Sequence, residues 1–390
     1  MRLADRIAGF KTQTSLEILQ KTRELESRGV RVVHFEVGEP DFDTPPHVVR
    51  ALEKSLEAGE THYGPPPGLP ELRRAIAEDS TRRLGTSFAP DEVIVTHGCK
   101  PVMIFSLLTC VNPGDEVLIP DPGYTLYPSL VRLVGATPVT YGFDANDRAR
   151  LDLAGLRARV TPRTRMIMLN SPGNPTGAVH SEEELAAIRD LAVEHDLWAV
   201  SDEIYSRIVY EGRHVSIARV PGMKERTIVL DGFSKGFAMT GWRLGYALAP
   251  RDIAARFALL MTHTTTCVST FVQRGGLAAL AAGDGSVLAM LEEFRARRAF
   301  MMDGLARIPG FRCEQPAGAF YVFPDAGALG LTTAALTDRL LEAGVAVVPG
   351  TSFGSRGEGH VRISFATSLG EIEEGLARIR AVAAAAPGVR

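Results

Sequence analysis

The chain has 390 residues, 45% of them hydrophobic, and a formal net charge of −3 at pH 7. This length exceeds what one compact domain of typical size needs, so we expect one large core and a second, smaller one. Acidic and basic residues are interspersed, without a basic tail or stripe of the kind that follows a phosphate backbone. The charge pattern therefore argues against nucleic acid as a partner.

Neither a membrane segment nor an export signal is predicted. No stretch approaches the roughly eighteen consecutive apolar residues of a membrane-spanning helix, and charged residues interrupt the apolar stretches of residues 1–15. The cysteines are scattered without a Cys-x-x-Cys pair, which favours neither a disulfide framework nor a metal site: Cys99, Cys110, Cys267 and Cys313. We expect a cytoplasmic location, no membrane partner and no metal.

The first predicted element is a helix over residues 16–28. Farther along, short runs rich in Val, Ile and Leu recur, each followed by a turn and then by a stretch with helical spacing; they lie at residues 93–96, 117–120, 166–169, 197–201 and 227–230. This alternation is typical of an α/β fold with a mostly parallel sheet flanked by helices. We place this large domain at residues 45–285.

The chain changes character from about residue 290. A charged, helix-like stretch over 291–307 precedes short strand-like pieces separated by glycine-rich turns, at residues 318–323, 345–348 and 361–365. This pattern predicts a smaller α/β domain. We expect the first forty or so residues to pack with it, which would make the small domain discontinuous, formed by residues 1–44 and 286–390.

Polar loops follow four of the predicted strands. They are His97–Pro101, Asn170–Gly177, Asp202–Tyr205 and Asp231–Tyr246. Taken singly, each of the first three is better explained as a turn or a helix cap, and the lysine of the fourth as a solvated surface residue. Because the carboxyl ends of parallel strands meet at one edge of a sheet, we expect all four loops to open on the same site.

Together these loops carry the groups that a pyridoxal phosphate cofactor needs. Its aldehyde needs an amine, its ring nitrogen a carboxylate, its phenolic oxygen donors, and its phosphate a cationic cradle rich in amides. Lys235 and Asp202 meet the first two needs, and Asn174 with Tyr205 the third. The cradle would be formed by Gly98 to Lys100, Ser234 and Arg243.

Three segments carry a family resemblance: NSPGNPTG at residues 170–177, SDEIY at 201–205 and FSKGFAMTGWRLGY at 233–246. With them the chain resembles the class I, fold-type I pyridoxal-phosphate aminotransferases, the aspartate aminotransferase group. The resemblance extends over nearly the whole chain, from residues 37–42 to 361–364. The lysine segment is the most specific of the three.

The resemblance implies a role for each residue around the cofactor ring. Lys235 would carry the cofactor as a Schiff base and, once freed by substrate, move the proton between Cα and C4′. Asp202 would pair with the ring nitrogen, Tyr205 and Asn174 would bond the phenolic oxygen, and Tyr124 would stack on the ring.

The resemblance also assigns the phosphate and the substrate. Gly98, Cys99, Lys100, Ser234 and Arg243 would surround the phosphate, and Tyr63 would reach it from a second subunit, which implies a homodimer. Arg362 would hold the substrate α-carboxylate as a bidentate fork, near the Gly38 backbone and Asn174. Tyr124 and Lys100 would face the substrate, Lys100 at its distal carboxylate.

Three features depart from the family pattern. Gly232 stands where many members have a serine, and residues 122–125 read Pro-Gly-Tyr-Thr where some aspartate-specific relatives have a Pro-Tyr-Trp type of segment. Near the expected substrate pocket lie Gln13 and Glu17. An anionic Glu17 in the pocket would disfavour a dicarboxylate, but a solvated helix residue is the simpler interpretation.

The leading hypothesis is an aminotransferase that exchanges the amino group between an L-amino acid and a 2-oxo acid by a ping-pong mechanism. Lys100 mildly supports an acidic substrate of the aspartate or glutamate type, while aromatic, prephenate-like and alanine-type substrates stay open. A different reaction on the same scaffold, such as elimination, replacement or cyclisation, is the alternative, because each begins with Cα deprotonation. A cofactor-binding regulator without activity is disfavoured, since every catalytic position is filled.

Overall fold

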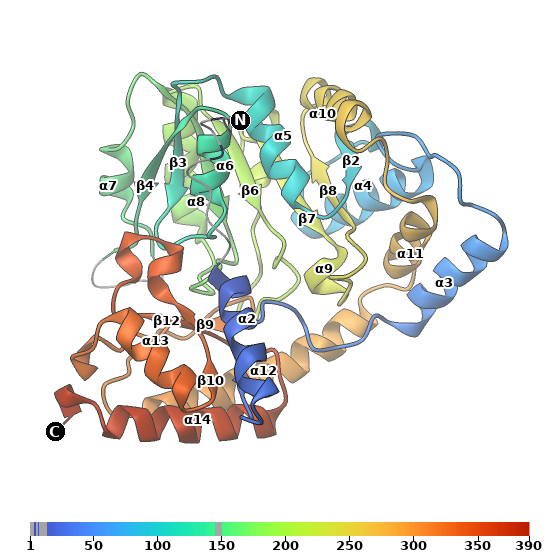
Figure 1. Ribbon diagram of the computed structural model, residues 1–390. Helices are drawn as coiled ribbons and strands as arrows, with labels where there is room; N and C mark the ends of the chain where they lie inside the picture. Colours follow the sequence, from blue (N-terminus) through green and yellow to red (C-terminus); the bar gives the residue numbers. More distant parts are fainter. Residues whose placement is uncertain (1–3, 5–6, 8–13, 145–149, 390) are drawn as a thin grey trace.

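The computed structural model describes residues 4, 7, 14–144 and 150–389. It has two lobes: a large one around a central sheet, and a smaller one that holds the C-terminal part of the chain and helix α2 (Thr14–Ser27) (Figure 1). No helix among these residues is long and apolar enough to cross a membrane.

The large lobe is built on a seven-stranded sheet with the order β2-β8-β7-β6-β5-β3-β4. Neighbouring strands pair in parallel, except that β8 runs antiparallel to both β2 and β7. The strands are β2 (Val93–Thr96), β3 (Glu116–Pro120), β4 (Thr137–Tyr141), β5 (Thr164–Asn170), β6 (Trp198–Asp202), β7 (Thr227–Gly232) and β8 (Gly245–Leu248). The predicted α/β fold with a mostly parallel sheet is confirmed, and all five predicted strands are present.

Both faces of the sheet are covered by helices. Val117 and Ile119 of β3 belong to a core cluster that includes helix α5 (Lys100–Cys110), whereas Leu118 belongs to another cluster with helix α8 (Glu182–Glu194). Alternate side chains of a strand point to opposite faces. Because both faces are buried, the strand reads as a continuous apolar run without a polar alternation.

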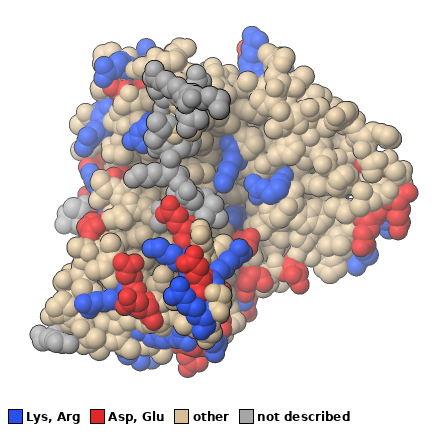
Figure 2. All heavy atoms as spheres, viewed as in Figure 1, with Lys and Arg blue, Asp and Glu red and all other residues tan. Residues whose placement is uncertain are grey.

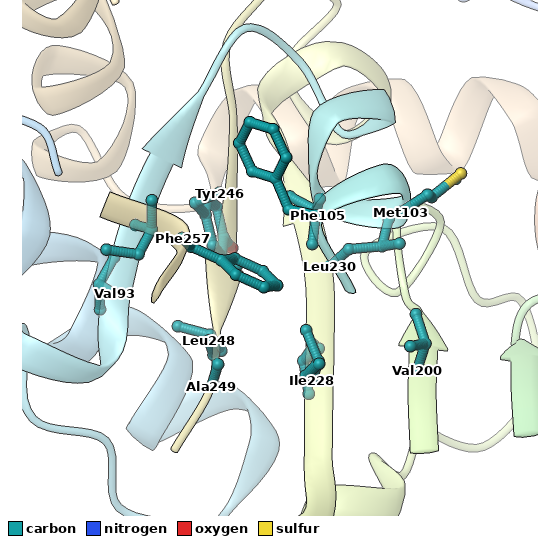
Figure 3. Packing of buried hydrophobic residues seen from close by; sticks show 14 of the residues in the cluster. Val93, Met103, Phe105, Val200, Ile228, Leu230, Tyr246, Leu248, Ala249 and Phe257 are labelled. Atoms are coloured by element: carbon teal, nitrogen blue, oxygen red, sulfur yellow. The ribbon is translucent and has the colours of Figure 1, made fainter. Parts of the chain in front are cut away.

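The remaining helices of the large lobe complete this packing. In Figure 3, Phe257 and Phe105 lie over the strands that carry Leu248 and Leu230. These two aromatic rings come from α10 (Arg251–Thr264) and α5, and their centroids are 5.8 Å apart. The other helices are α3 (Pro46–Glu57), α4 (Pro70–Leu84), α6 (Tyr127–Leu133), α7 (Leu153–Arg157), α9 (Phe233–Gly236) and α11 (Thr270–Ala281).

The smaller lobe joins the two ends of the described chain. Strand β1 (Val33–His34) pairs in parallel with β10 (Val345–Ala346), and β12 lies between β11 and β9 in an antiparallel sheet. The other elements are β9 (Tyr321–Val322), β11 (Val348–Pro349), β12 (Val361–Ser364), α12 (Gly285–Ala306), α13 (Thr333–Glu342) and α14 (Leu369–Ala384). The bounds of the two domains, 45–285 and 1–44 with 286–390, stay a prediction.

His34 ties helix α2 to strand β1. Its Nδ1 lies 2.8 Å from Oε1 of Glu36, and its Nε2 lies 3.1 Å from Oε1 of Glu26 in α2. The hydrogen bond to Glu36, helped by that to Glu26, raises the pKa of His34 from 6.5 to about 9. The protonated ring therefore bridges a carboxylate of α2 and the carboxylate that follows β1.

This arrangement predicts a pH-dependent contribution to stability. A pKa raised by folding stabilises the native state fully below the unfolded pKa of 6.5, and the effect is lost as the pH rises through about 9. Because a third of the side chain is exposed, we expect the His34→Gln variant to lose about 1 kcal/mol of unfolding free energy in mild acid. Urea denaturation should show that this deficit disappears above pH 9; an equal deficit at both pH values would refute the charged pairing.

Candidate active site

A cavity of about 630 Å³ lies at the carboxyl ends of the parallel strands, where the two lobes meet. On this face the molecule is hollowed between the lobes, and basic side chains gather at the hollow (Figure 2). All predicted site residues line the cavity except Gly98 and Tyr63. A second cavity of similar volume is lined by Pro122, Phe143 and Arg356 among others, and by none of the predicted site residues. The two cavities are therefore distinguished by the side chains that line them and not by their size.

Lys235 enters the cavity from the short helix α9, directly after β7. Its Nζ donates a hydrogen bond to the carbonyl oxygen of Gly38, which belongs to the N-terminal part of the chain. Burial lowers the pKa of Lys235 to about 8, and the negative charge of Glu39 opposes this shift. The amine is therefore closer to its neutral, nucleophilic form than an exposed lysine would be.

Asp202 lies at the end of β6 and is paired in register with Asn170 at the end of β5. Its Oδ2 accepts a hydrogen bond of 2.7 Å from the Tyr127 hydroxyl, and both side chains are buried. Burial raises the pKa of Asp202 to about 7, against the opposing effect of the Tyr127 hydrogen bond. A cation placed against this carboxylate would restore its charge.

Tyr127 is a site residue that the sequence reasoning missed. It opens helix α6, three residues after Tyr124, and the two rings lie edge to face with centroids 5.5 Å apart. The two residues are close in the sequence, and the Tyr127 N–H donates to the Tyr124 carbonyl oxygen at 3.1 Å. Tyr127 was missed because the resemblance assigned no role to it.

Arg362 projects from β12 and is buried, with 5% of its surface exposed. Its Nη2 donates to the Glu36 carbonyl oxygen at 2.6 Å, and its Nη1 donates to Oδ1 of Asn174 at 3.3 Å. Its Nε is buried without a hydrogen-bond partner among the described residues. An unpaired buried guanidinium nitrogen is costly, so the site is suited to an incoming carboxylate.

Asn174 is held by its own loop. Its backbone N–H donates to Oδ1 of Asn170 at 2.7 Å, and Nδ2 of Asn170 donates to the Asp202 carbonyl oxygen at 3.1 Å. One asparagine at the end of β5 therefore fixes both the predicted cofactor loop and the strand that carries the carboxylate.

The loop after β2 meets Arg243 at the start of α5. Gly98 has a φ of 71°, and a Cβ added there would lie 2.5 Å from Nη2 of Arg243. Only glycine allows this approach of backbone to guanidinium. Lys100 begins α5, and burial together with the charge of Arg243 lowers its pKa. Free helix amides beside two cations form a site for a phosphate.

The remaining predicted residues differ in position. Ser234 is buried beside Lys235 and lines the cavity, as does Cys99, whose Sγ donates to the Asp231 carbonyl oxygen at 3.2 Å. Tyr63 is 90% exposed and outside the cavity of its own chain. Its predicted role in a second subunit is not tested within one chain.

Besides Asp202, the acidic residues that line the cavity differ from the one considered for the substrate pocket. Glu17 is exposed on α2 and does not line it, and Gln13 lies outside the described residues. Glu36 and Glu39 line the cavity instead. Oε2 of Glu36 is buried without a hydrogen-bond partner among the described residues.

Comparison with known proteins identifies the family. The profile "Aminotransferase class I and II" matches residues 30–379. The chain belongs to this family. Aminotransferases of this type use pyridoxal 5′-phosphate, so the chain is a pyridoxal-phosphate-dependent aminotransferase, and the predictions of family, enzyme class and cofactor are confirmed.

Named relatives cover nearly the whole aminotransferase chain. It is 41% identical to the aspartate/prephenate aminotransferase of Thermus thermophilus over 97% of this chain and 98% of the relative. It is 38% identical to the aspartate aminotransferase of Geobacillus stearothermophilus over 97% of this chain and 98% of the relative. The structure of the Thermus thermophilus aspartate aminotransferase with maleate matches with a TM-score of 0.94, over 98% of this chain and 100% of that one.

The residues of the cavity fit the cofactor of this aminotransferase. Asp202 is a buried carboxylate suited to a protonated ring nitrogen, Lys235 is a half-buried amine with a lowered pKa, and Gly98 with Arg243 forms a cationic cradle that a side chain would fill. The chemistry of these groups, rather than the volume of the cavity, carries the fit.

We predict that Tyr127→Phe weakens cofactor binding. The variant leaves the buried Asp202 carboxylate without its 2.7 Å donor, and loss of a hydrogen bond to a charged group should raise the cofactor dissociation constant by about 10-fold. Fluorescence titration of apoprotein with pyridoxal phosphate measures it. Tyr141→Phe is a matched control, because this buried tyrosine donates to the Met168 carbonyl oxygen away from the site. Equal affinities in both variants would argue against the role of Tyr127.

Proposed function

We propose that this aminotransferase transfers the amino group of an acidic L-amino acid, of the aspartate or glutamate type, to a 2-oxo acid. The observation that carries the proposal is the convergence of Lys235, Asp202 and Arg362 in one cavity, with Lys100 on its wall. The names of the relatives support the substrate class, since those compared above are aspartate or aspartate/prephenate aminotransferases.

Lys235 holds the cofactor and removes the substrate Cα proton. Once bound, pyridoxal phosphate supplies an electron sink for the charge that develops at that carbon. A base works best when its pKa is near the working pH, and the pKa of about 8 at Lys235 meets that condition. Asp202, held by Tyr127, keeps the ring nitrogen protonated.

Arg362 orients the substrate through its α-carboxylate. The guanidinium is held by the Glu36 carbonyl oxygen and by Asn174, so its plane is fixed before substrate arrives. A fixed fork costs little entropy on binding and sets the Cα–H bond relative to Lys235. Gly38 leaves room beside it, because a Cβ there would lie 2.8 Å from the Tyr321 hydroxyl.

The phosphate is held by Gly98, Cys99, Lys100, Ser234 and Arg243. We propose that Tyr63 of a second copy completes this cradle and that the enzyme is a homodimer. The 90% exposure of Tyr63 in one chain supports a position at a subunit interface. The absence of paired cysteines is consistent with the proposed cytoplasmic location, since all four are free thiols.

The test of the central assignment is Lys235→Ala. We expect its half-reaction with aspartate or glutamate to slow by roughly 10²- to 10⁴-fold or more, because both the attachment and the base are lost. Stopped-flow absorbance after mixing enzyme with amino acid measures the rate, and oxo acid release measures the product. Lys224→Ala, which removes a lysine bound to Glu92, is the control. A Lys235→Ala enzyme with the wild-type rate would disprove the assignment.

Substrate class can be tested at Lys100. If its ammonium meets the distal carboxylate, Lys100→Gln should lower kcat/KM for aspartate by about 10-fold relative to alanine, which lacks that group. Steady-state kinetics with both amino acids separates this effect from a change at the phosphate, which would lower both values equally. An unchanged aspartate-to-alanine ratio would contradict the acidic-substrate proposal.

A further inference from the structure

Tyr321 lies between the groups assigned to the cofactor and those assigned to the substrate. It belongs to β9, is 1% exposed and lines the cavity. Its strand pairs with β12, which carries Arg362, through the registers of Ser364 with Tyr321 and of Ile363 with Val322. The small lobe therefore presents a tyrosine and an arginine from neighbouring strands to one site.

The Tyr321 hydroxyl is bonded to the Tyr205 hydroxyl at 2.9 Å. Burial raises the pKa of both phenols, so both keep their protons at neutral pH. One hydroxyl must donate in this bond, and the proton of the other is then free. Either hydroxyl can donate in this bond. An ionised phenolic oxygen of the cofactor would be a stronger acceptor than a neutral hydroxyl, so Tyr205 would donate to that oxygen and Tyr321 would donate to Tyr205.

A Tyr205 hydroxyl that accepts from Tyr321 keeps its own proton for the cavity. Hydrogen bonds in a chain polarise each other, so acceptance from Tyr321 strengthens Tyr205 as a donor. The proposed partner of Tyr205 is the phenolic oxygen of the cofactor. The Tyr321 hydroxyl would thus influence the phenolic oxygen of the cofactor through Tyr205, without contacting it.

The ring of Tyr321 has a separate contact. The Arg362 guanidinium carbon lies 4.4 Å from its centroid. Such a cation–π contact supports the guanidinium plane from one face, while the Glu36 carbonyl oxygen and Asn174 hold its edge. The ring and the hydroxyl of one residue therefore act on two different parts of the site.

We propose that Tyr321 is a positioning residue of this aminotransferase: its hydroxyl directs the Tyr205 proton toward the cofactor, and its ring braces Arg362 for the substrate carboxylate. The inference rests on the proposed roles of Tyr205 and Arg362. One residue of β9 would then affect both the ionisation of the cofactor's phenolic oxygen and the binding of the substrate carboxylate.

Two variants separate the two actions. In Tyr321→Phe the ring remains, so maleate, a dicarboxylate probe, should bind holoenzyme within about twofold of wild type. Without the second hydroxyl Tyr205 stabilises an anionic phenolic oxygen less, and the apparent pKa from the pH titration of the cofactor's visible absorbance should rise by roughly half a unit or more. In Tyr321→Leu the ring is also lost, and maleate should bind about fivefold more weakly.

Tyr210 offers a matched control. It is a buried tyrosine of the same lobe, with the Arg298 guanidinium carbon 4.6 Å from its ring centroid and its hydroxyl bonded to the Ala319 carbonyl oxygen, and it does not line the cavity. Tyr210→Phe and Tyr210→Leu should change thermal stability and leave both the absorbance titration and maleate affinity unchanged.

The inference is overturned if Tyr321→Phe titrates as wild type, or if Tyr321→Leu binds maleate as tightly as wild type. Changes in melting temperature alone would assign Tyr321 a structural role and would also overturn it. Failure of the proposed function would be seen in a different experiment, in which the wild-type enzyme gives no half-reaction with acidic amino acids. Binding and titration need only folded holoenzyme, so the two failures are distinguishable.

Discussion

A carboxylate buried at the carboxyl end of β6 is the constraint on which the active site depends. Asp202 is taken out of water at a cost that raises its pKa to about 7, and Tyr127 offsets part of that cost through one hydrogen bond. A buried carboxylate with one strong donor is completed by a cation. A protonated ring nitrogen supplies that cation, so binding the cofactor relieves a cost already present in the protein.

The parallel sheet explains why the other groups meet this carboxylate. β5, β6 and β7 are neighbours, and the residues directly after them are the Asn174 loop, Tyr205 and Lys235. The small lobe adds what the sheet edge lacks, since the Gly38 carbonyl oxygen and Arg362 come from segments far away in the sequence. A backbone hydrogen bond of 2.9 Å, from the Ser364 N–H to the Phe35 carbonyl oxygen, joins those two segments. The small lobe thus acts as one unit against the sheet edge.

The sequence predicted the residues whose position follows from strand ends, and it failed where position depends on packing. Lys235 and Asp202 follow buried apolar runs, so their convergence could be argued from periodicity and parallel topology. Strand β4 was missed because its outer position leaves Thr137 exposed and puts Pro138 within it. Tyr321 could not be found, because nothing in its surroundings marks a cavity and its partners Tyr205 and Arg362 lie far from it in the sequence.

Positive and negative side chains occupy different parts of the cavity, so a ligand with unlike ends can bind in only one orientation. Lys100 and Arg243 gather at the α5 end, while Arg362 stands at the small lobe beside the Glu36 carbonyl oxygen. Asp202 lies on the sheet side, and the charge of Glu36 is partly met by His34. Two cationic regions are thus separated by one acidic side chain. This distribution complements the cofactor and substrate together, which carry a phosphate at one end, a cationic ring in the middle and a carboxylate at the other end.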